Sequence, residues 1–150
     1  MNLQEYYSDL SRGYLDGADN IKLDYIIKYP EELAESFSSQ LSTKQIRSFF
    51  DASHVLKTKT DRGATVESVL PDLYLLSSTI VAKVNKGIIP ASFAKFYRSN
   101  LDVIKTKKDL DCFMKHFEAV YNLLPETEKK AIPKEDNKSK NGNYNNFRRN

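Results

Sequence analysis

Apolar residues recur every three or four positions through most of the chain, and this spacing limits the fold more than any other feature of the sequence. Such spacing places apolar side chains on one face of a helix, whereas strands alternate with a period of two. Runs of alternation are scarce, so we predict an all-α protein, a compact helical bundle of about five to six helices. The clearest stripe contains Leu110, Phe113, Met114, Phe117, Val120, Tyr121 and Leu124.

Two other predicted helices divide into an apolar face and a wet, mostly cationic face. One begins after Ser42 and the other begins at Pro90. Between them, a long apolar segment has a stripe made of Leu73, Leu76, Ser77, Ile80 and Val84. The inward sets of the first two helices are Ile46, Phe49, Phe50, Ser53 and Leu56, and Phe93, Phe96, Tyr97, Leu101 and Ile104. The outward sets are Lys44, Arg47 and His54, and Lys95, Arg98, Asp102 and Lys105.

Local signals mark several helix ends. Ser42 with Gln45, and Thr106 with Asp109, have the spacing of a capping box, in which each side chain bonds the other residue's backbone N–H. Gly87 follows the long apolar segment at the place where a left-handed residue ends a helix. We therefore predict helix starts directly after Ser42 and Thr106 and a helix end before Gly87.

Two regions are less decided by pattern. Pro71 should lie in the first turn of its helix or kink it, because proline lacks the N–H that a helix interior needs. The segment "IKLDYIIKY", residues 21 to 29, is rich in residues that favour strands and is compatible with a short strand or a strained helix. An N-terminal helix over residues 2 to 12 and another starting near Pro30 are expected on either side of it.

Charge is unevenly distributed along this chain of 150 residues, whose length suits one small domain. Residues 1–40 carry −5, residues 41–125 carry +5, and residues 126–150 carry +3. We expect an acidic N-terminal helical extension over residues 1–40, a helical core domain over 41–125 and a disordered basic tail over 126–150. The lone Cys112 excludes an internal disulfide, and no apolar run is long enough for a membrane span, which favours a cytoplasmic protein.

Groups with the spacing of a catalytic or metal site are scarce. Cys112 and His116 are four residues apart and can share a helix face, but two ligands do not make a metal site, and a small residue beside a partly buried histidine explains them better. Asp109 and Asp111 flank a helix start, where carboxylates are favoured. We therefore predict no enzymatic activity, no metal and no cofactor.

A nucleic-acid surface is better supported. Phosphate backbones are held by lysine and arginine arrayed on a surface, without catalytic geometry. Three predicted helices offer such pairs at helical spacing: Lys44 with Arg47, Lys83 with Lys86, and Lys95 with Arg98. We predict these six residues as RNA-binding, the alternative being that they only solvate their helices.

Two segments resemble a known family. "LSTKQIRSFFDASHVL" resembles the leucine, two hydroxyl residues and Ile/Leu-Arg pair near the start of the core in the small subunit of type III-A CRISPR–Csm effector complexes. "KKDLDCFMKHFEAVYNLL" resembles that family's last helix, in which Phe117, Glu118, Ala119 and Val120 match an (M/F)-E-A-(V/L) pattern. The Gly-Arg common at the end of an intervening helix is absent, and Lys83 and Lys86 stand near that place. The resemblance covers about residues 41 to 124, and it leaves the first 40 residues and the tail outside.

The resemblance implies a non-catalytic small subunit. Several copies of it would line a ribonucleoprotein filament, contacting the backbone subunits, the polymerase-like large subunit, further copies of itself, and the target RNA paired with the guide RNA. Only Arg47 matches a basic residue of the family motif; the other five cations come from helix faces. Two alternatives remain: a helical protein-interaction module or regulator that does not bind RNA, and the small subunit of the related type III-B complexes.

Overall fold

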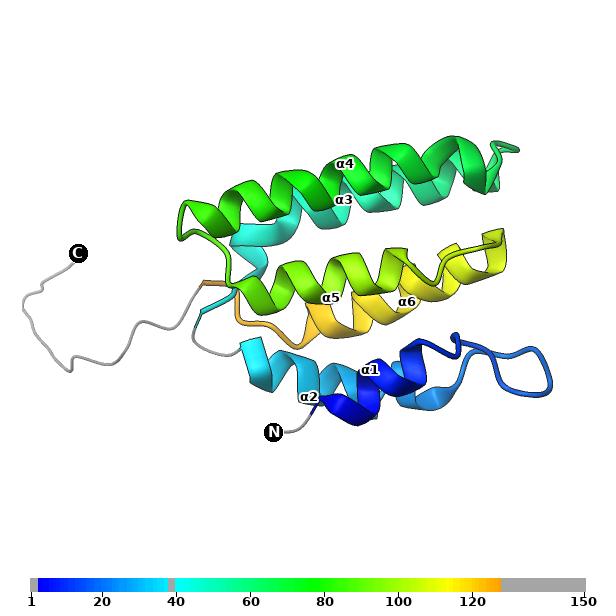
Figure 1. Cartoon of the computed structure of the whole chain (residues 1–150), viewed down its shortest axis with the longest axis horizontal. Coiled ribbons are helices and arrows are strands. Elements are labelled where there is room, and N and C mark those ends of the chain that lie inside the picture. Colours follow the sequence, from blue (N-terminus) through cyan, green and yellow to red (C-terminus); the bar gives the residue numbers. More distant parts are fainter. Residues whose placement is uncertain (1–2, 38–39, 128–150) are drawn as a thin grey trace, which may run out of the picture.

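Six α-helices and a short 3₁₀ helix make up the described part of the computed structural model, which covers residues 3–37 and 40–127 (Figure 1). These residues contain no strand beyond one isolated bridge, and the predicted all-α fold is confirmed. The elements are α1 (Gln4–Leu10), η1 (Leu23–Tyr25), α2 (Lys28–Phe37), α3 (Thr43–Asp61), α4 (Val66–Asn85), α5 (Ala91–Leu101) and α6 (Lys107–Asn122).

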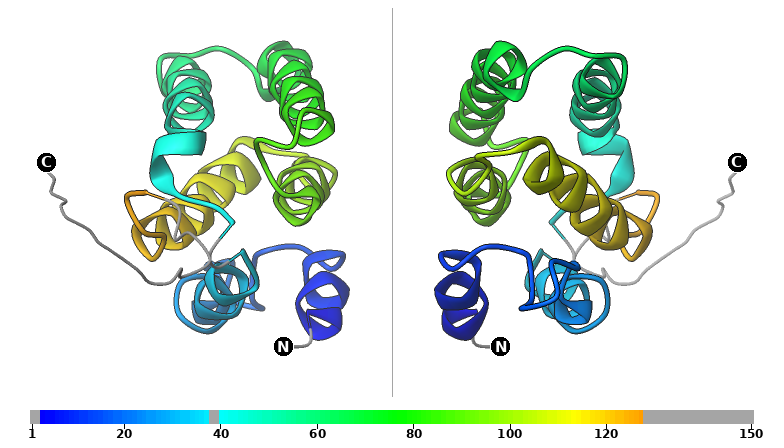
Figure 2. Two further views of the ribbon diagram at one scale, coloured as in Figure 1. Left: turned by 90° about the vertical axis from the view of Figure 1, so that its left-hand side faces the viewer. Right: turned by 90° about the vertical axis from the view of Figure 1, so that its right-hand side faces the viewer.

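The helices form three layers of two. Helices α3 and α4 make one outer layer, α5 and α6 the middle layer, and α1 and α2 the other outer layer (Figures 1 and 2). Helix α4 packs on α5 and α3 packs on α6, while α2 packs on α6 and α1 on α5. The middle helices are therefore covered on both sides by the outer layers.

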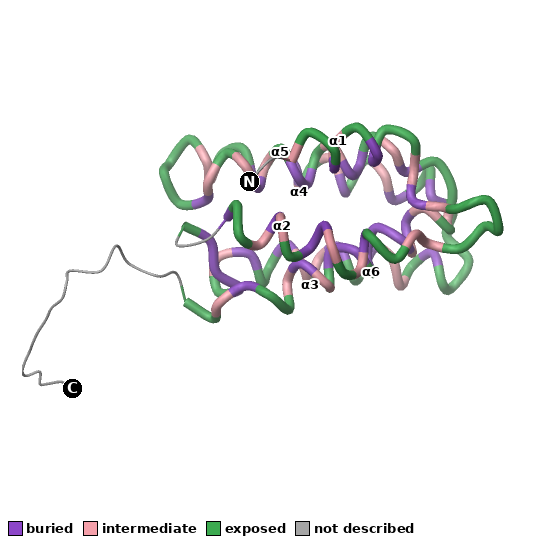
Figure 3. Tube along the Cα trace, turned by 90° about the horizontal axis from the view of Figure 1, so that it is seen from below, coloured by how far each residue is buried: buried purple, intermediate pink, exposed green. Residues whose placement is uncertain are grey.

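One hydrophobic core runs through all three layers, and buried positions recur along every helix (Figure 3). Phe93, Phe96 and Phe117 of the middle layer are fully buried. The N-terminal segment contributes four buried tyrosines to the same core, Tyr6, Tyr14, Tyr25 and Tyr29. Burial of aromatic side chains on this scale makes residues 3–37 part of the packed body of the protein.

The local signals for helix ends are confirmed. Ser42 Oγ accepts from the Gln45 backbone N–H, and Gln45 Oε1 accepts from the Ser42 backbone N–H at 2.6 Å. Thr106 and Asp109 form the second capping box at the start of α6. Gly87 has φ of +75°, the left-handed conformation expected after a helix.

The predicted faces of α3 and α5 are confirmed with one exception. All five inward residues of α5 and its C-terminal turn are buried, and so are those of α3 apart from Phe50, which is half-buried. The outward residues Lys44, Arg47 and His54 are exposed, as are Lys95, Arg98, Asp102 and Lys105.

The structure resolves the two regions that the sequence pattern left open, Pro71 and residues 21 to 29. Pro71 lies beyond the first turn of α4, because Thr65 caps that helix by accepting from Ser68 N–H at 3.1 Å and so starts it earlier. Pro71 has no N–H to donate to the carbonyl of Glu67, and both residues are exposed. In residues 21 to 29, Ile21 pairs with Leu15 in the isolated bridge and the chain then enters η1 and α2.

Helix α6 is the last helix within the described residues. Helix α6 ends at Asn122, and residues up to Thr127 follow it. The tail predicted for residues 126–150 lies outside the described residues except for its first two positions. Within residues 3–37 and 40–127, no helix has the length and apolarity needed to cross a membrane.

Candidate nucleic-acid interface

The first turn of α3 is hydrogen-bonded to the segment that follows α6. Pro125 O accepts from Thr43 N–H at 2.9 Å, and Glu126 O accepts from Lys44 N–H at 3.2 Å. Together with the Ser42 cap, these carbonyls satisfy the backbone donors that a helix N-terminus otherwise leaves free. A phosphate at this end must therefore be bound by side chains rather than by the helix backbone.

Lys44 and Arg47 project from this first turn into solvent. Both are exposed, and neither side chain makes an ion pair or hydrogen bond with another described residue. The capping box and the buried face of α3 account for the helix without them. Their charges are consequently available to a ligand.

Lys83 and Lys86 lie at the same end of the outer layer as Lys44. Ile88 N–H donates to Lys83 O at 2.9 Å, and Ile88 O accepts from Gln45 Nε2 at 2.8 Å. Through Ile88 these bonds connect the last turn of α4 to the first turn of α3, and the two helix ends lie close together at the left of Figure 1. Within the described residues the two lysine side chains also have no polar partner. The structure thus brings four of the six predicted cations to one end of the α3 and α4 layer.

Lys95 and Arg98 are separate from that group and are engaged within the fold. Lys95 Nζ lies 4.5 Å from the ring centroid of Tyr7. Arg98 Nε lies 3.2 Å from Asp102 Oδ1, and its guanidinium lies 5.1 Å from the ring centroid of Tyr74. Part of the charge of each is therefore used to join α5 to its neighbours.

The opposite end of α3 shows why helical spacing alone cannot identify free cations. Lys107 Nζ bridges Asp61 Oδ1 at 2.6 Å and Asp111 Oδ1 at 2.9 Å, and Lys57 Nζ contacts Asp61 Oδ2 at 2.8 Å. The bonds from Lys107 and Lys57 lower the pKa of Asp61 to about 2. Lys59 and Arg62, also exposed and at this end, make no side-chain polar contact in the described part of the chain.

His116 is fully buried, more so than its sequence position indicated, and both ring nitrogens are occupied. Nδ1 lies 2.6 Å from Tyr25 O, which can only accept, so Nδ1 carries the hydrogen and Nε2 accepts from Tyr6 O–H at 2.8 Å. Asn100 Nδ2 donates to the Tyr6 oxygen at 3.0 Å, and Tyr14 O–H donates to Asn100 Oδ1 at 2.6 Å. The four bonds form a chain in which every donor meets an acceptor.

Burial determines the direction of the pKa shifts of His116 and Cys112. Burial lowers the pKa of His116 to about 4, although its bond to Tyr25 acts in the opposite direction. Burial also raises the pKa of the Cys112 thiol. Among residues 3–37 and 40–127, no three potential metal ligands come together. The pair is part of the helical core, and the long-range partners of His116 could not be found from sequence spacing.

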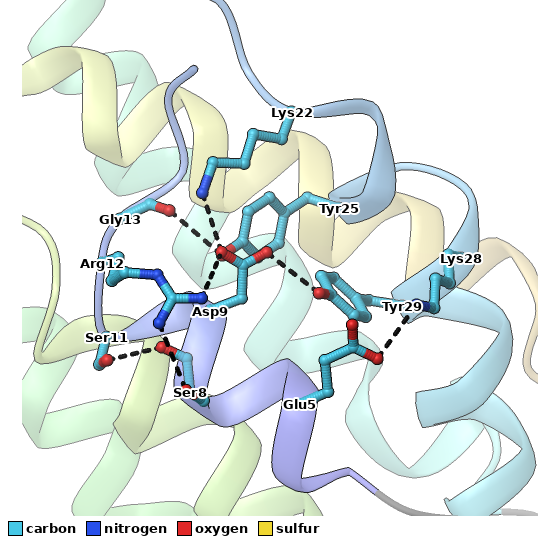
Figure 4. Close-up of polar contacts among 10 residues, drawn as sticks. All are labelled: Glu5, Ser8, Asp9, Ser11, Arg12, Gly13, Lys22, Tyr25, Lys28 and Tyr29. Atoms are coloured by element: carbon cyan, nitrogen blue, oxygen red, sulfur yellow. Dashed lines mark hydrogen bonds and ion pairs between the residues drawn. The ribbon is translucent and has the colours of Figure 1, made fainter. Parts of the chain in front are cut away.

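A second polar cluster fixes the N-terminal segment (Figure 4). Asp9 accepts from Lys22 Nζ at 2.8 Å and from Tyr29 O–H at 3.0 Å, and Arg12 lies 3.6 Å away. Burial raises the pKa of Asp9, but the bonds from Lys22 and Tyr29 outweigh it and the pKa is lowered. Tyr25 O–H donates to Gly13 O at 3.1 Å beside this cluster.

Comparison with models of known protein families identifies the family of this chain. The model of the Csm2 Type III-A family matches residues 20–122. The chain belongs to this family. Csm2 is the structural small subunit of the type III-A Csm complex of CRISPR defence, as the resemblance implied. No curated protein and no solved structure matches the chain.

The Csm2 match is longer than the resemblance on which the prediction rested. It starts at residue 20, so the expectation that all of the first 40 residues lie outside the family was wrong for residues 20–40. It includes all six predicted cations and His116, and α1 lies before it. The bond from His116 to Tyr25 is therefore internal to the Csm2 region, whereas its bond to Tyr6 reaches outside it.

Proposed function

We propose that this Csm2 family member binds the phosphate backbone of the target RNA paired with the guide RNA, and packs as a non-catalytic subunit between the backbone subunits. The observation that supports this proposal is the group of four exposed or half-exposed cations at one end of the outer layer, Lys44, Arg47, Lys83 and Lys86. Their side chains make no ion pair or hydrogen bond with another described residue. Lys95 and Arg98 extend the same function along α5, with a smaller share because they are engaged with Tyr7, Tyr74 and Asp102.

Charge across the layers supports the same orientation. Residues 41–86, which contain α3 and α4, carry seven basic and four acidic side chains, a net charge of +3. Residues 1–40, which contain α1 and α2 on the opposite side, carry −5. A polyanion is therefore favoured on the α3 and α4 layer, and a basic protein neighbour on the α1 and α2 layer.

The test is a salt series of RNA binding by the full chain and by the assembled complex. Replacing Lys44 and Arg47 by alanine should weaken binding to unrelated single-stranded RNAs. It should also make the log–log salt dependence shallower by about 0.7 for each phosphate that is no longer neutralised. Stability should stay within about 0.5 kcal/mol of the parent, because both residues are exposed and unpaired.

The chain offers a matched control at the other end of the same helix. The double variant Lys59→Ala, Arg62→Ala removes the same charge from exposed, unpaired positions and should leave the salt slope closer to that of the parent. A Lys44 and Arg47 variant with unchanged affinity and slope in both preparations would reject the RNA-binding role and favour the protein-interaction module.

A further inference from the structure

A groove of ≈ 390 Å³ lies between α3 and α6, on a flank of α3 below its first turn. Its lining combines an aromatic ring and a thioether with charged rims. The residues around it are Phe50, His54, Lys57, Asp111, Met114, Lys115 and Glu118. A groove of this composition can receive a flat, largely apolar group.

Phe50 presents an aromatic surface in this groove. It is half-buried, the one inward residue of α3 that is not fully covered. Its ring stacks on Tyr121 with centroids 4.3 Å apart and planes at 14°, and Phe117 meets it edge to face at 5.1 Å. Phe50 lines the groove and Tyr121 does not. A third planar ring entering the groove can therefore extend an existing stack.

The rim of the groove is close to neutral. Lys57 is paired with Asp61, and Asp111 is paired with Lys107. Of the remaining rim groups, Lys115 and Glu118 carry opposite charges and neither makes a side-chain polar contact with a described residue. This balance disfavours a phosphate inside the groove and suits an uncharged base, whose amino groups can donate to a carboxylate such as Glu118.

Arg47 does not line the groove, but it lies one helical turn from Phe50, which does. Arg47, Phe50 and His54 follow each other at helical spacing, and residues three or four apart on a helix are neighbours. Arg47 is exposed and unpaired. One nucleotide can therefore place its phosphate at Arg47 and its base over Phe50.

We propose that the groove between α3 and α6 binds a nucleobase of the target RNA held at Arg47 that is not paired with the guide RNA, by stacking the base on Phe50. This inference rests on the proposed function and deepens it. Stacking on aromatic rings is the common way that proteins hold single-stranded RNA, and it tolerates any base because every base has a π-face. The site therefore contributes affinity for unpaired RNA with little preference for sequence.

The test compares two phenylalanine variants of the full chain. Phe50→Leu should weaken binding of single-stranded RNA by roughly 5- to 100-fold, the range that corresponds to removal of one base stack. The salt slope should not change, because no phosphate contact is removed. Phe113→Leu is the matched control: Phe113 is fully buried and does not line the groove, so its RNA affinity should equal that of the parent under conditions in which both variants are folded.

A second measurement does not depend on the stability of a variant. RNA carrying 5-iodouridine, which crosslinks on irradiation to aromatic rings stacked on the base, should attach to Phe50 of the parent protein, as located by mass spectrometry. Parent-like affinity of Phe50→Leu together with no crosslink at Phe50 would overturn the inference. So would a Phe50→Leu variant that fails to join the complex but binds RNA normally, because the groove would then be a protein contact.

Failure of this inference can be told apart from failure of the proposed function. A shallower salt slope in the Lys44 and Arg47 variant with no effect of Phe50→Leu would leave the phosphate contacts and remove the base site. No effect of the Lys44 and Arg47 variant would remove the proposed function itself.

Discussion

Replacing Tyr6 by phenylalanine tests whether the buried chain of hydrogen bonds holds the layers together. The hydroxyl of Tyr6 lies 2.8 Å from His116 Nε2 and 3.0 Å from Asn100 Nδ2, and all three residues are fully buried. Its removal leaves one acceptor of His116 and one donor of Asn100 without a partner, while Asn100 keeps its bond to Phe96 O. At about 1–3 kcal/mol for each of these two buried unsatisfied groups, we expect the free energy of unfolding to fall by roughly 2–6 kcal/mol.

The assay is urea denaturation followed by circular dichroism. Tyr121→Phe is the control, because that ring is half-buried and its hydroxyl makes no hydrogen bond in the described part of the chain; it should change stability by no more than about 0.5 kcal/mol. If Tyr6→Phe were as stable as Tyr121→Phe, the hydrogen bonds of the Tyr6 hydroxyl would contribute nothing measurable to the stability of the fold.

Three further predictions follow from the core and the helix ends. Phe117→Ala should cost about 3–5 kcal/mol in denaturant melts, since it empties a fully buried ring site at the centre of the middle layer; parent-like stability would contradict that placement. The pKa of about 4 for folded His116 lies below the value of about 6.5 for an unfolded histidine, so the unfolded chain binds more protons between these values. This contribution to stability should be complete above pH 6.5 and decrease by roughly 3 kcal/mol as the pH falls towards 4, and urea melts of His116→Gln should show a flatter pH dependence in that window. Truncation after Thr127 should leave the melting temperature unchanged, whereas truncation after Leu124 removes both carbonyls that cap α3 and should lower it; equal melting temperatures would show that these caps add nothing.

Features fixed by neighbouring residues were predictable from the sequence. The Ser42 and Thr106 capping boxes and the left-handed Gly87 each depend on groups a few positions apart, and each is present. The inward and outward faces of α3 and α5 follow from helical periodicity alone. Phe50 is the informative exception, because its partial exposure depends on how α3 meets α6 rather than on its own helix.

Features fixed by distant residues could not be predicted. The partners of His116 are 91 and 110 positions away, so its burial has no local signature. The burial of Tyr6 and Tyr25 could not be predicted from the net negative charge of residues 1–40. Most of the acidic side chains lie on the surface, while these tyrosines face the core. Lys95 and Lys44 also differ in a way that the sequence does not show. Lys95 lies over the ring of Tyr7 on another helix, whereas Lys44 does not lie over a ring.

The opposite charges of the two outer layers give the protein a permanent dipole moment directed from one layer to the other. An approaching polyanion attracts one layer and repels the other, so the resulting torque turns the molecule before contact is made. This torque raises the association rate and the fraction of encounters that lead to binding. It has little effect on the lifetime of the complex. The orienting field fades over a Debye length of about 8 Å at physiological salt, so the protein selects its orientation only within the last nanometre of approach.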